Sequence, residues 1–232
     1  MARWLLSLLL LLAPLGLTAC AGESVSRPQG CETSQTPCLQ GSAVISLVTS
    51  KGEVKLQLDG PAAPLTAGNF VDLVNRGAYN GTVFHRVVRE PVPFVVQGGD
   101  PQSANAKVPA TQYGMGSYMD PTSGESRLLP LEIKLQNEPT PRYGEVLTAP
   151  GITRQLALVH QRGAVAMARS NDPNSASAQF YIALQALPEL DGRYAVFGRV
   201  VQGMDVVDRI QQGDKLTKAS VVEGGTLVQA RP

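Results

Sequence analysis

The chain has 232 residues and a formal net charge of +1, and 43% of its residues are hydrophobic. This length allows one domain with a sizeable core. The near-neutral charge gives no sign of the broad basic surface that drives nucleic-acid binding, and the sequence has no acidic run that would suggest a cation store. Glycine and proline are abundant, with 23 and 17 copies, whereas only 5% of the residues are aromatic. This composition favours strands and turns over a helical bundle.

Residues 1–19 have the composition of a secretory leader. Arg3 supplies a positive start, a leucine-rich stretch runs over residues 4–17, and small residues follow. The stretch is short for a membrane span and contains Pro14 and Gly16 near its end. These features favour a leader that is removed over the alternative of a permanent signal anchor.

The last residues of the leader and the residue that follows it, Leu17-Thr18-Ala19-Cys20, resemble the bacterial lipobox. The resemblance implies cleavage before Cys20 and attachment of lipid to its sulfur, and palmitate is expected among the acyl groups of the lipoprotein. Two or more acyl chains anchor a protein durably where one gives marginal binding, because each buried methylene contributes about 0.8 kcal/mol. We therefore expect a membrane-anchored lipoprotein on the extracytoplasmic side, either periplasmic or at the cell surface, that lies on a membrane and does not cross it.

Residues 20–42 are predicted to form a flexible tether, because they are rich in Ser, Thr, Gln, Gly and Pro and show no apolar period. Cys31 and Cys38 lie within it. Oxidising surroundings after export favour a disulfide between them, with two free thiols as the alternative. Their spacing is not that of a C-x-x-C redox pair, and no histidine or cysteine pair completes a zinc set, so no metal site is predicted.

The body, residues 43–230, is predicted to be a single, mainly β domain. Two strands are expected over 43–49 and 53–58, and the alternation of the second is typical of a half-buried hairpin strand. Apolar residues at helical spacing predict a helix over 65–76 and a second one near 205–211. The remaining segments are short, β-branched and separated by turns, a pattern that predicts a barrel or a sandwich.

Five strings of the body form a joint signature. They are FHRV at 84–87, FVVQGGDP at 94–101, GAVAMAR at 163–169, SAQFYIAL at 177–184 and LDGRYAVFGRV at 190–200. Together they resemble the cyclophilin family of peptidyl-prolyl cis-trans isomerases, from about Val44 to about Val228. The resemblance implies an eight-stranded antiparallel β-barrel closed by two α-helices. It also implies an isomerase without a cofactor, a monomer, and proline-containing polypeptides as clients.

Prolyl isomerisation sets specific chemical requirements. Rotation about an Xaa-Pro bond faces a barrier of about 20 kcal/mol from amide resonance, and no bond is made or broken. The catalyst must therefore grip the proline ring and favour the twisted amide. In that state the prolyl nitrogen regains a lone pair, to which a fixed cationic donor hydrogen-bonds. Such a bond contributes about 1.5 to 3 kcal/mol, so one donor helps but does not supply the whole acceleration.

The resemblance assigns these tasks to particular residues. Arg86 matches the catalytic arginine, and its permanent charge and planar fork suit the role of donor. Phe94 matches the aromatic floor of the proline pocket, and Tyr181, Val95 and Leu190 match its other walls. The remaining expected substrate contacts are Gln97, Gly114, Ala168, Arg169, Gln179 and Tyr194. Outside this signature, an arginine on a strand is usually solvated and an isolated aromatic residue usually belongs to the core.

Some features depart from the family pattern or stand apart from it. Residues 87–93 make a longer link between Arg86 and Phe94 than typical members have, so the spacing of donor and pocket depends on how this link folds. Glu189 stands where the family's cyclosporin-contacting tryptophan would lie, which predicts weak binding of that drug. Residues 105–161 form an expanded excursion. His85 is expected to be a structural histidine with its hydrogen bonds satisfied.

Three functions are consistent with the sequence. The first is a lipid-anchored isomerase that accelerates the folding of exported proteins. The second is a proline-recognising binding or chaperone module, in which the longer link preserves the grip but abolishes turnover. The third is a scaffold lipoprotein that uses its long excursion to hold a membrane complex.

Overall fold

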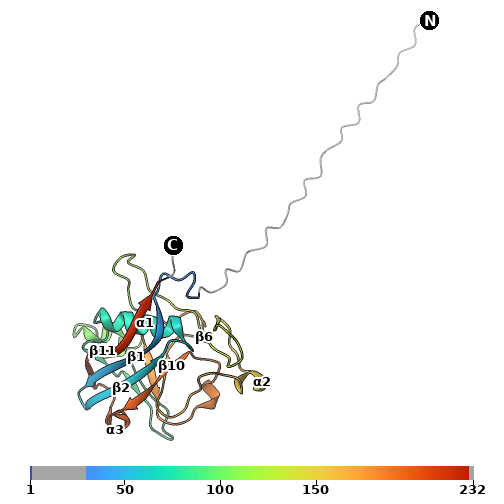
Figure 1. Cartoon of the computed structure of the whole chain (residues 1–232). Coiled ribbons are helices and arrows are strands. Elements are labelled where there is room, and N and C mark those ends of the chain that lie inside the picture. Colours follow the sequence, from blue (N-terminus) through green and yellow to red (C-terminus); the bar gives the residue numbers. More distant parts are fainter. Residues whose placement is uncertain (2–29, 230–232) are drawn as a thin grey trace.

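The structure, a computed structural model, describes Met1 and residues 30–229 (Figure 1). The predicted leader and the predicted lipidation site, Cys20, lie outside the described residues. The strands are β1 (Cys38–Thr49), β2 (Gly52–Asp59), β3 (Thr82–Val83), β4 (Arg86–Val87), β5 (Val95–Gly98), β6 (Glu132–Ile133), β7 (Arg142–Tyr143), β8 (Ala164–Met167), β9 (Phe180–Ala183), β10 (Val196–Gln202) and β11 (Lys215–Val228). The helices are α1 (Pro64–Asn75), α2 (Pro150–Thr153) and α3 (Met204–Arg209), with 3-10 turns η1 (Pro101–Ala104), η2 (Ala110–Gln112) and η3 (Pro188–Leu190).

One curled antiparallel sheet makes up most of the fold (Figure 1). Its nine strands follow the order β3-β11-β1-β2-β10-β8-β9-β5-β4. The two edge strands, β3 and β4, are consecutive in the chain and only Phe84 and His85 separate them. A single interrupted strand therefore joins the two edges of the sheet. When β3 and β4 are counted as one strand, the sheet has the eight antiparallel strands that the resemblance implied.

Helix α1 packs against β1 and β11 and fills the interior between them. It buries Phe70, whose ring centroid lies 4.7 Å from that of Tyr79 and 5.2 Å from those of Phe180 and Phe197. Tilted and edge-on contacts of this kind contribute beyond the area that they bury. The predicted helices, 65–76 and 205–211, correspond to α1 and α3 to within two residues at each boundary. Among the described residues, no helix is long and apolar enough to cross a bilayer.

A carboxylate from outside the helix caps the start of α1. Glu132 on β6 is buried and accepts hydrogen bonds from the backbone N–H groups of Leu65 at 3.1 Å and Thr66 at 2.7 Å. The hydroxyl of Tyr143 on β7 donates to the same carboxylate at 2.9 Å. The first backbone N–H groups of a helix have no partner within the helix, and the positive end of its dipole favours an anion there. Burial nevertheless raises the pKa of Glu132 above its usual range, and the bond from Thr66 opposes this effect.

The prediction of a flexible tether over residues 20–42 is wrong at its C-terminal end. Strand β1 begins at Cys38, which is 2% exposed and pairs with Val228 on β11. Helix α1 lies so close that a Cβ at Gly68 would collide with the carbonyl oxygen of Pro37. Composition indicated a loop, but burial beneath α1 and pairing with β11 outweigh that local preference. The body therefore begins by Cys38 and not at residue 43.

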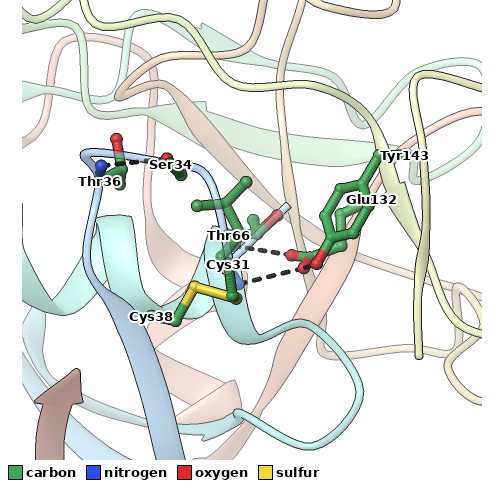
Figure 2. The surroundings of a disulfide bond; sticks show 8 residues. Cys31, Ser34, Thr36, Cys38, Thr66, Glu132 and Tyr143 are labelled. Atoms are coloured by element: carbon green, nitrogen blue, oxygen red, sulfur yellow. Dashed lines mark hydrogen bonds between the residues drawn. A yellow bond between two sulfur atoms is a disulfide. The ribbon is translucent and has the colours of Figure 1, made fainter. Parts of the chain in front are cut away.

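The disulfide between Cys31 and Cys38 is confirmed, with Cα atoms 5.9 Å apart (Figure 2). It closes a small loop in which the hydroxyl of Ser34 accepts a hydrogen bond from the N–H of Thr36 at 3.0 Å. Figure 2 shows this loop beside Thr66, Glu132 and Tyr143, near the start of α1. The disulfide thus fixes the segment that enters the barrel against the N-terminal end of the central helix.

The excursion over 105–161 folds mainly into turns, with α2, η2 and the short β6–β7 pair within it. A small apolar cluster stabilises it, separate from the barrel core, with Leu131, Ile133, Leu135, Leu147, Leu156 and Ala195 as its buried members. Residues 128–133 are largely apolar, but only 132–133 form a strand, and they pair with β7 and not with the main sheet.

Candidate functional site

The hairpin β4–β5 carries the predicted donor and the predicted pocket floor. Arg86 pairs with Gln97 and Val87 with Val96. The pairing continues one step further, because the N–H of Val88 donates to Val95 O and the N–H of Phe94 donates to Val88 O, both at 2.9 Å. The extra residues therefore form a loop over 89–93 that projects beyond the closed end of the ladder. The longer link leaves the register between Arg86 and Gln97 intact.

Arg89 fastens this loop to the end of α3. Its Nη2 atom donates to Val207 O at 3.0 Å and to Ile210 O at 2.9 Å, at the C-terminal end of α3. The last carbonyls of a helix lack partners within the helix and attract cations. Arg89 thus provides hydrogen-bond donors for two carbonyl groups at the end of α3, and it holds the loop in one position.

Arg86 and Phe94 face each other at the mouth of a pocket. The guanidinium carbon of Arg86 lies 5.7 Å from the centroid of the Phe94 ring, and the Arg86 side chain is exposed. The pocket has a volume of about 220 Å³. All nine of its lining residues were predicted site residues: Arg86, Phe94, Val95, Gln97, Ala168, Arg169, Tyr181, Leu190 and Tyr194.

A second pocket, of about 210 Å³, adjoins the first and shares Gln97, Ala168 and Arg169 with it. Its lining includes the two remaining predicted residues, Gly114 and Gln179. The structure therefore brings all the predicted catalytic and substrate-binding residues into one groove of two joined hollows. Met115 and Gly116, which belong to the same glycine-rich segment as Gly114, also line the second pocket, whereas sequence reasoning missed Ser117, Ser170, Ser175 and Ser177.

A directed chain of hydrogen bonds ends at Arg86. Gln179 Nε2 donates to the carbonyls of Gly114 at 3.0 Å and Gly116 at 2.8 Å, so its Oε1 faces the other way. That oxygen accepts from Gln97 Nε2 at 3.3 Å, and Gln97 Oε1 accepts in turn from Arg86 Nη1 at 3.4 Å. Because an amide has one donor end and one acceptor end, the two carbonyls set the orientation of both glutamines.

Asp100 anchors the start of this chain and was not singled out from the sequence. Its fully buried carboxylate accepts from the N–H groups of Gly114 at 2.6 Å and Gly116 at 3.3 Å, and from Gln102 N–H at 2.9 Å. A buried carboxylate is costly unless several donors satisfy it. Its position at the end of the FVVQGGDP string was the available signal, but only the fold reveals which amides it binds.

Arg169 and Tyr194, two further residues expected to contact substrate, both line the first pocket. Arg169 packs over Tyr194, with its guanidinium carbon 4.7 Å from the ring centroid. Its Nη2 and Nε atoms donate to Arg193 O at 2.6 and 3.0 Å. The Tyr194 ring meets the Tyr181 ring edge-on at a centroid distance of 5.8 Å. Arg169 therefore fixes the loop that carries Tyr194 against the pocket.

The expectation that His85 has satisfied hydrogen bonds is wrong. Both ring nitrogens of His85 are buried, and neither has a partner among the described residues. The ring lies against Gly114, where a Cβ would come within 2.9 Å of His85 Cδ2. Burial lowers the pKa of the imidazole below its usual value, against the opposing charge of Asp100. The ring of His85 therefore packs directly against the glycine wall of the second pocket.

Two larger hollows, of about 780 and 1120 Å³, contain none of the predicted site residues. The first lies behind the β4–β5 loop, and the second lies beside the disulfide loop. Most of the residues that line them are polar or charged. Among the described residues, no group of three histidine, cysteine or acidic side chains is placed to hold a metal ion. The pocket at Arg86 is the candidate site because the predicted catalytic and substrate-binding residues line it, although it is smaller than these two hollows.

Residues 44–230 match the family described as cyclophilin type peptidyl-prolyl cis-trans isomerase/CLD. The chain is 35% identical over 176 residues to peptidyl-prolyl cis-trans isomerase A of Dickeya dadantii, covering 74% of this chain and 72% of that protein. It is 37% identical over 203 residues to a Synechocystis sp. protein whose assignment as a thylakoid lumen peptidyl-prolyl cis-trans isomerase is provisional. This match covers 83% of the chain but only 50% of the Synechocystis protein, so the chain spans about half the length of that relative.

Among solved structures, a cyclophilin type isomerase of Cryptosporidium parvum, crystallised in the presence of the dipeptide Ala-Pro, has a TM-score of 0.55. It is 22% identical, and the match covers 78% of this chain and 99% of the other. At this level of identity the likeness concerns the fold alone.

Proposed function

Because the chain belongs to the cyclophilin-type peptidyl-prolyl cis-trans isomerase family, we propose that it accelerates the cis-trans isomerisation of Xaa-Pro bonds in polypeptides. The observation that carries the proposal is the placement of Arg86 over Phe94 at the mouth of the 220 Å³ pocket. A proline ring in this pocket would have its nitrogen within reach of a fixed cationic donor. That is the arrangement that the chemistry of amide rotation requires.

In the mechanism that we propose, Phe94, Val95, Tyr181 and Leu190 grip the proline ring. The Arg86 guanidinium then donates a hydrogen bond to the prolyl nitrogen as the amide twists and the nitrogen lone pair becomes available. This bond is stronger in the twisted state than in either planar state, so it lowers the barrier. Gln97 and Gln179 hold the guanidinium in place, so little of its freedom has to be lost during the reaction.

The proline-containing clients are proposed to be exported proteins. Three observations support an extracytoplasmic location. The leader ends in a lipobox-like string, the chain carries a Cys31–Cys38 disulfide, and the Synechocystis relative is assigned, provisionally, to the thylakoid lumen. Structural disulfides persist in oxidising compartments. The Cryptosporidium isomerase was crystallised in the presence of Ala-Pro, which supports a short Xaa-Pro peptide as the test substrate.

The test of isomerase function measures exchange between the cis and trans forms of an Ala-Pro peptide by NMR, with the full chain at catalytic concentration. We expect the exchange rate to rise in proportion to protein concentration. Shifted or broadened peptide signals without faster exchange would contradict the proposal and favour a proline-binding module. If the native chain does not bind the peptide at all, both the isomerase and the proline-binding module are contradicted.

The lipid anchor is tested separately. Cells that produce the chain are supplied with labelled palmitate, and the native chain is compared with Cys20→Ser. We expect label on the native chain and none on Cys20→Ser. Cys31→Ser is the matched control, because it removes a cysteine that is disulfide-bonded, and it should keep the label. Equal labelling of the native chain and Cys20→Ser would contradict the proposal that Cys20 carries the lipid anchor.

A further inference from the structure

Three polar groups form a buried chain directly behind the proline pocket. The phenol oxygen of Tyr181, a wall of the pocket, lies 2.9 Å from Nε2 of His160. Nδ1 of His160 lies 2.8 Å from Oδ1 of Asp191, and the same oxygen accepts the backbone N–H of His160 at 2.8 Å. His160 is 2% exposed and Tyr181 4% exposed. The mechanism described above uses neither His160 nor Asp191.

Hydrogen-bond chemistry sets the direction of this chain. The Asp191 carboxylate accepts only, so Nδ1 of His160 carries the proton that lies between them. In the neutral imidazole Nε2 is then an acceptor, and the Tyr181 hydroxyl donates to it. Burial favours this neutral form and lowers the pKa of His160 below its usual value, although Asp191 and the nearby Glu189 act in the opposite sense. The Tyr181 hydroxyl therefore has one direction in which to point.

The chain joins two walls of the pocket that belong to different elements. Tyr181 lies on β9, whereas Asp191 directly follows Leu190 at the end of η3. His160 contacts the η3 segment a second time, because its carbonyl accepts the N–H of Leu187 at 2.8 Å. Leu190 and Tyr181 both line the pocket. The imidazole of His160 thus links the two walls, and its hydrogen bonds help to set the distance between them.

We propose that His160 is a positioning residue, which acts through Tyr181 to set the width of the proline pocket and hence the affinity for the proline ring. The proposal deepens the proposed function and rests on it, since the pocket is taken to receive proline. Without the imidazole, the Tyr181 hydroxyl would lack its buried acceptor, and the ring would have to turn to find another. Truncating one partner of a buried hydrogen bond has this effect because the other partner is left unsatisfied.

The test is a double-mutant cycle on peptide binding. His160→Leu, Tyr181→Phe and the double variant are made in the full chain, and the Kd for an Ala-Pro peptide is measured by chemical-shift titration. We expect His160→Leu to weaken binding about fivefold when Tyr181 is present and by less than about twofold in the Tyr181→Phe background, since coupled residues are not additive. The exchange rate of the bound peptide should change by less than about twofold, because Arg86 and its hydrogen-bond chain do not contact His160.

A matched control removes a buried tyrosine hydroxyl elsewhere. Tyr79 is fully buried and its hydroxyl donates to Ala178 O at 3.0 Å. Tyr79→Phe should lower the unfolding temperature and leave the peptide Kd unchanged. His160→Gln, whose amide offers both a donor and an acceptor, should retain most of the native affinity.

Equal weakening by His160→Leu in both backgrounds, or no weakening in a folded protein, would overturn the proposal and leave His160 a residue of stability only. If His160→Leu does not fold, the cycle is run with Asp191→Ala, which keeps the imidazole but releases it from its anchor. Equal weakening by Asp191→Ala in both backgrounds, or no weakening in a folded protein, would then overturn the proposal. Because the readout is binding, a native chain that binds peptide without turnover would contradict the proposed isomerase function and leave this test intact.

Discussion

Arg86 lies 5.7 Å from the centre of the Phe94 ring although residues 87–93 separate them in the chain. The relationship survives because Val88 bonds to both Phe94 and Val95 and closes the hairpin beneath the extra residues. A longer loop outside a closed pair adds little strain to the ladder below it, since the cost of closure grows slowly with length. The distance between the donor and the pocket floor is thus a property of strand register and not of loop length.

The first prediction concerns the hydrogen bonds that link Gln179 and Gln97 to Arg86. In Gln179→Glu, a carboxylate would face the carbonyl oxygens of Gly114 and Gly116, to which the native amide donates. The side chain has to turn away, and Gln97 loses its partner. We expect kcat/KM for an Ala-Pro peptide to fall about tenfold, because misplacement of a catalytic group is costly. Gln57→Glu, on β2 beside Arg199, is the matched control and should be without effect. Native activity in Gln179→Glu would show that the amide chain does not position Arg86.

We expect this chain to bind cyclosporin weakly although it catalyses isomerisation. Glu189, in η3, is exposed and lies outside both pockets of the groove. The native chain is expected to bind the drug weakly, and Glu189→Trp should tighten binding about tenfold or more, as a buried aromatic anchor does at an interface. Peptide exchange should be unchanged within about twofold. Calorimetric titration of the two proteins with cyclosporin measures the difference, and tight binding by the native chain would contradict the prediction.

The Cys31–Cys38 disulfide closes a short loop, with a sequence separation of 7. The chain-entropy relation gives a stabilisation of about 2.5 kcal/mol for a loop of this size. Cys31→Ser should lower the free energy of unfolding by roughly this amount in urea titration. Peptide exchange should be retained at temperatures where the variant is folded, since no residue of the loop lines the groove. A variant as stable as the native chain would indicate that packing beneath α1 alone holds the segment.

Stability should fall as the pH is lowered below about 6.5, the usual pKa of histidine. Burial lowers the pKa of both His85 and His160 in the folded chain. Between those lowered values and about 6.5, the unfolded chain binds more protons than the folded chain, so the free energy of unfolding rises with pH in this window. Glu132 acts in the opposite sense, because its raised pKa adds stability at acid pH that is lost as the pH rises.

The check is urea unfolding of the native chain and His160→Gln at about pH 5 and about pH 7. His160→Gln should reduce the loss of stability on acidification, and His85 should account for much of what remains. A variant with the same pH dependence as the native chain would contradict the assignment of a buried neutral imidazole to His160.

The resemblance to the cyclophilin family predicted the groove, because all of the expected residues except Gly114 lie within the five matching strings. Val95 and Gln97 are two residues apart on β5 and therefore share one face of the strand, so placing one of them places the other. What the sequence did not reveal depends on segments distant in the chain. Glu132 caps α1 from another part of the fold, and His160 reaches Tyr181 from the end of the excursion.

The error at Cys38 has a similar cause. Nothing in the composition of residues 30–42 indicates that a helix will lie on top of them. The close approach of Gly68 to Pro37 and Cys38 is a feature of tertiary structure. That neither ring nitrogen of His85 has a partner within residues 30–229 is another such feature, because a satisfied histidine is the ordinary outcome and nothing in the sequence indicated that this ring would pack against Gly114.

The central claim, that Arg86 is the donor of a prolyl isomerase, is tested most directly by kcat/KM for Ala-Pro exchange in four full-length proteins. These are the native chain, Arg86→Ala, Arg86→Lys and the control Arg199→Ala, which removes an exposed arginine on β10 that bonds Gln57. We predict a loss of about 10- to 100-fold in Arg86→Ala, as expected for a charged hydrogen bond made in the transition state. Arg86→Lys should fall between, since a lysine keeps the charge without the planar fork, and Arg199→Ala should match the native chain. Native activity in Arg86→Ala would contradict the account.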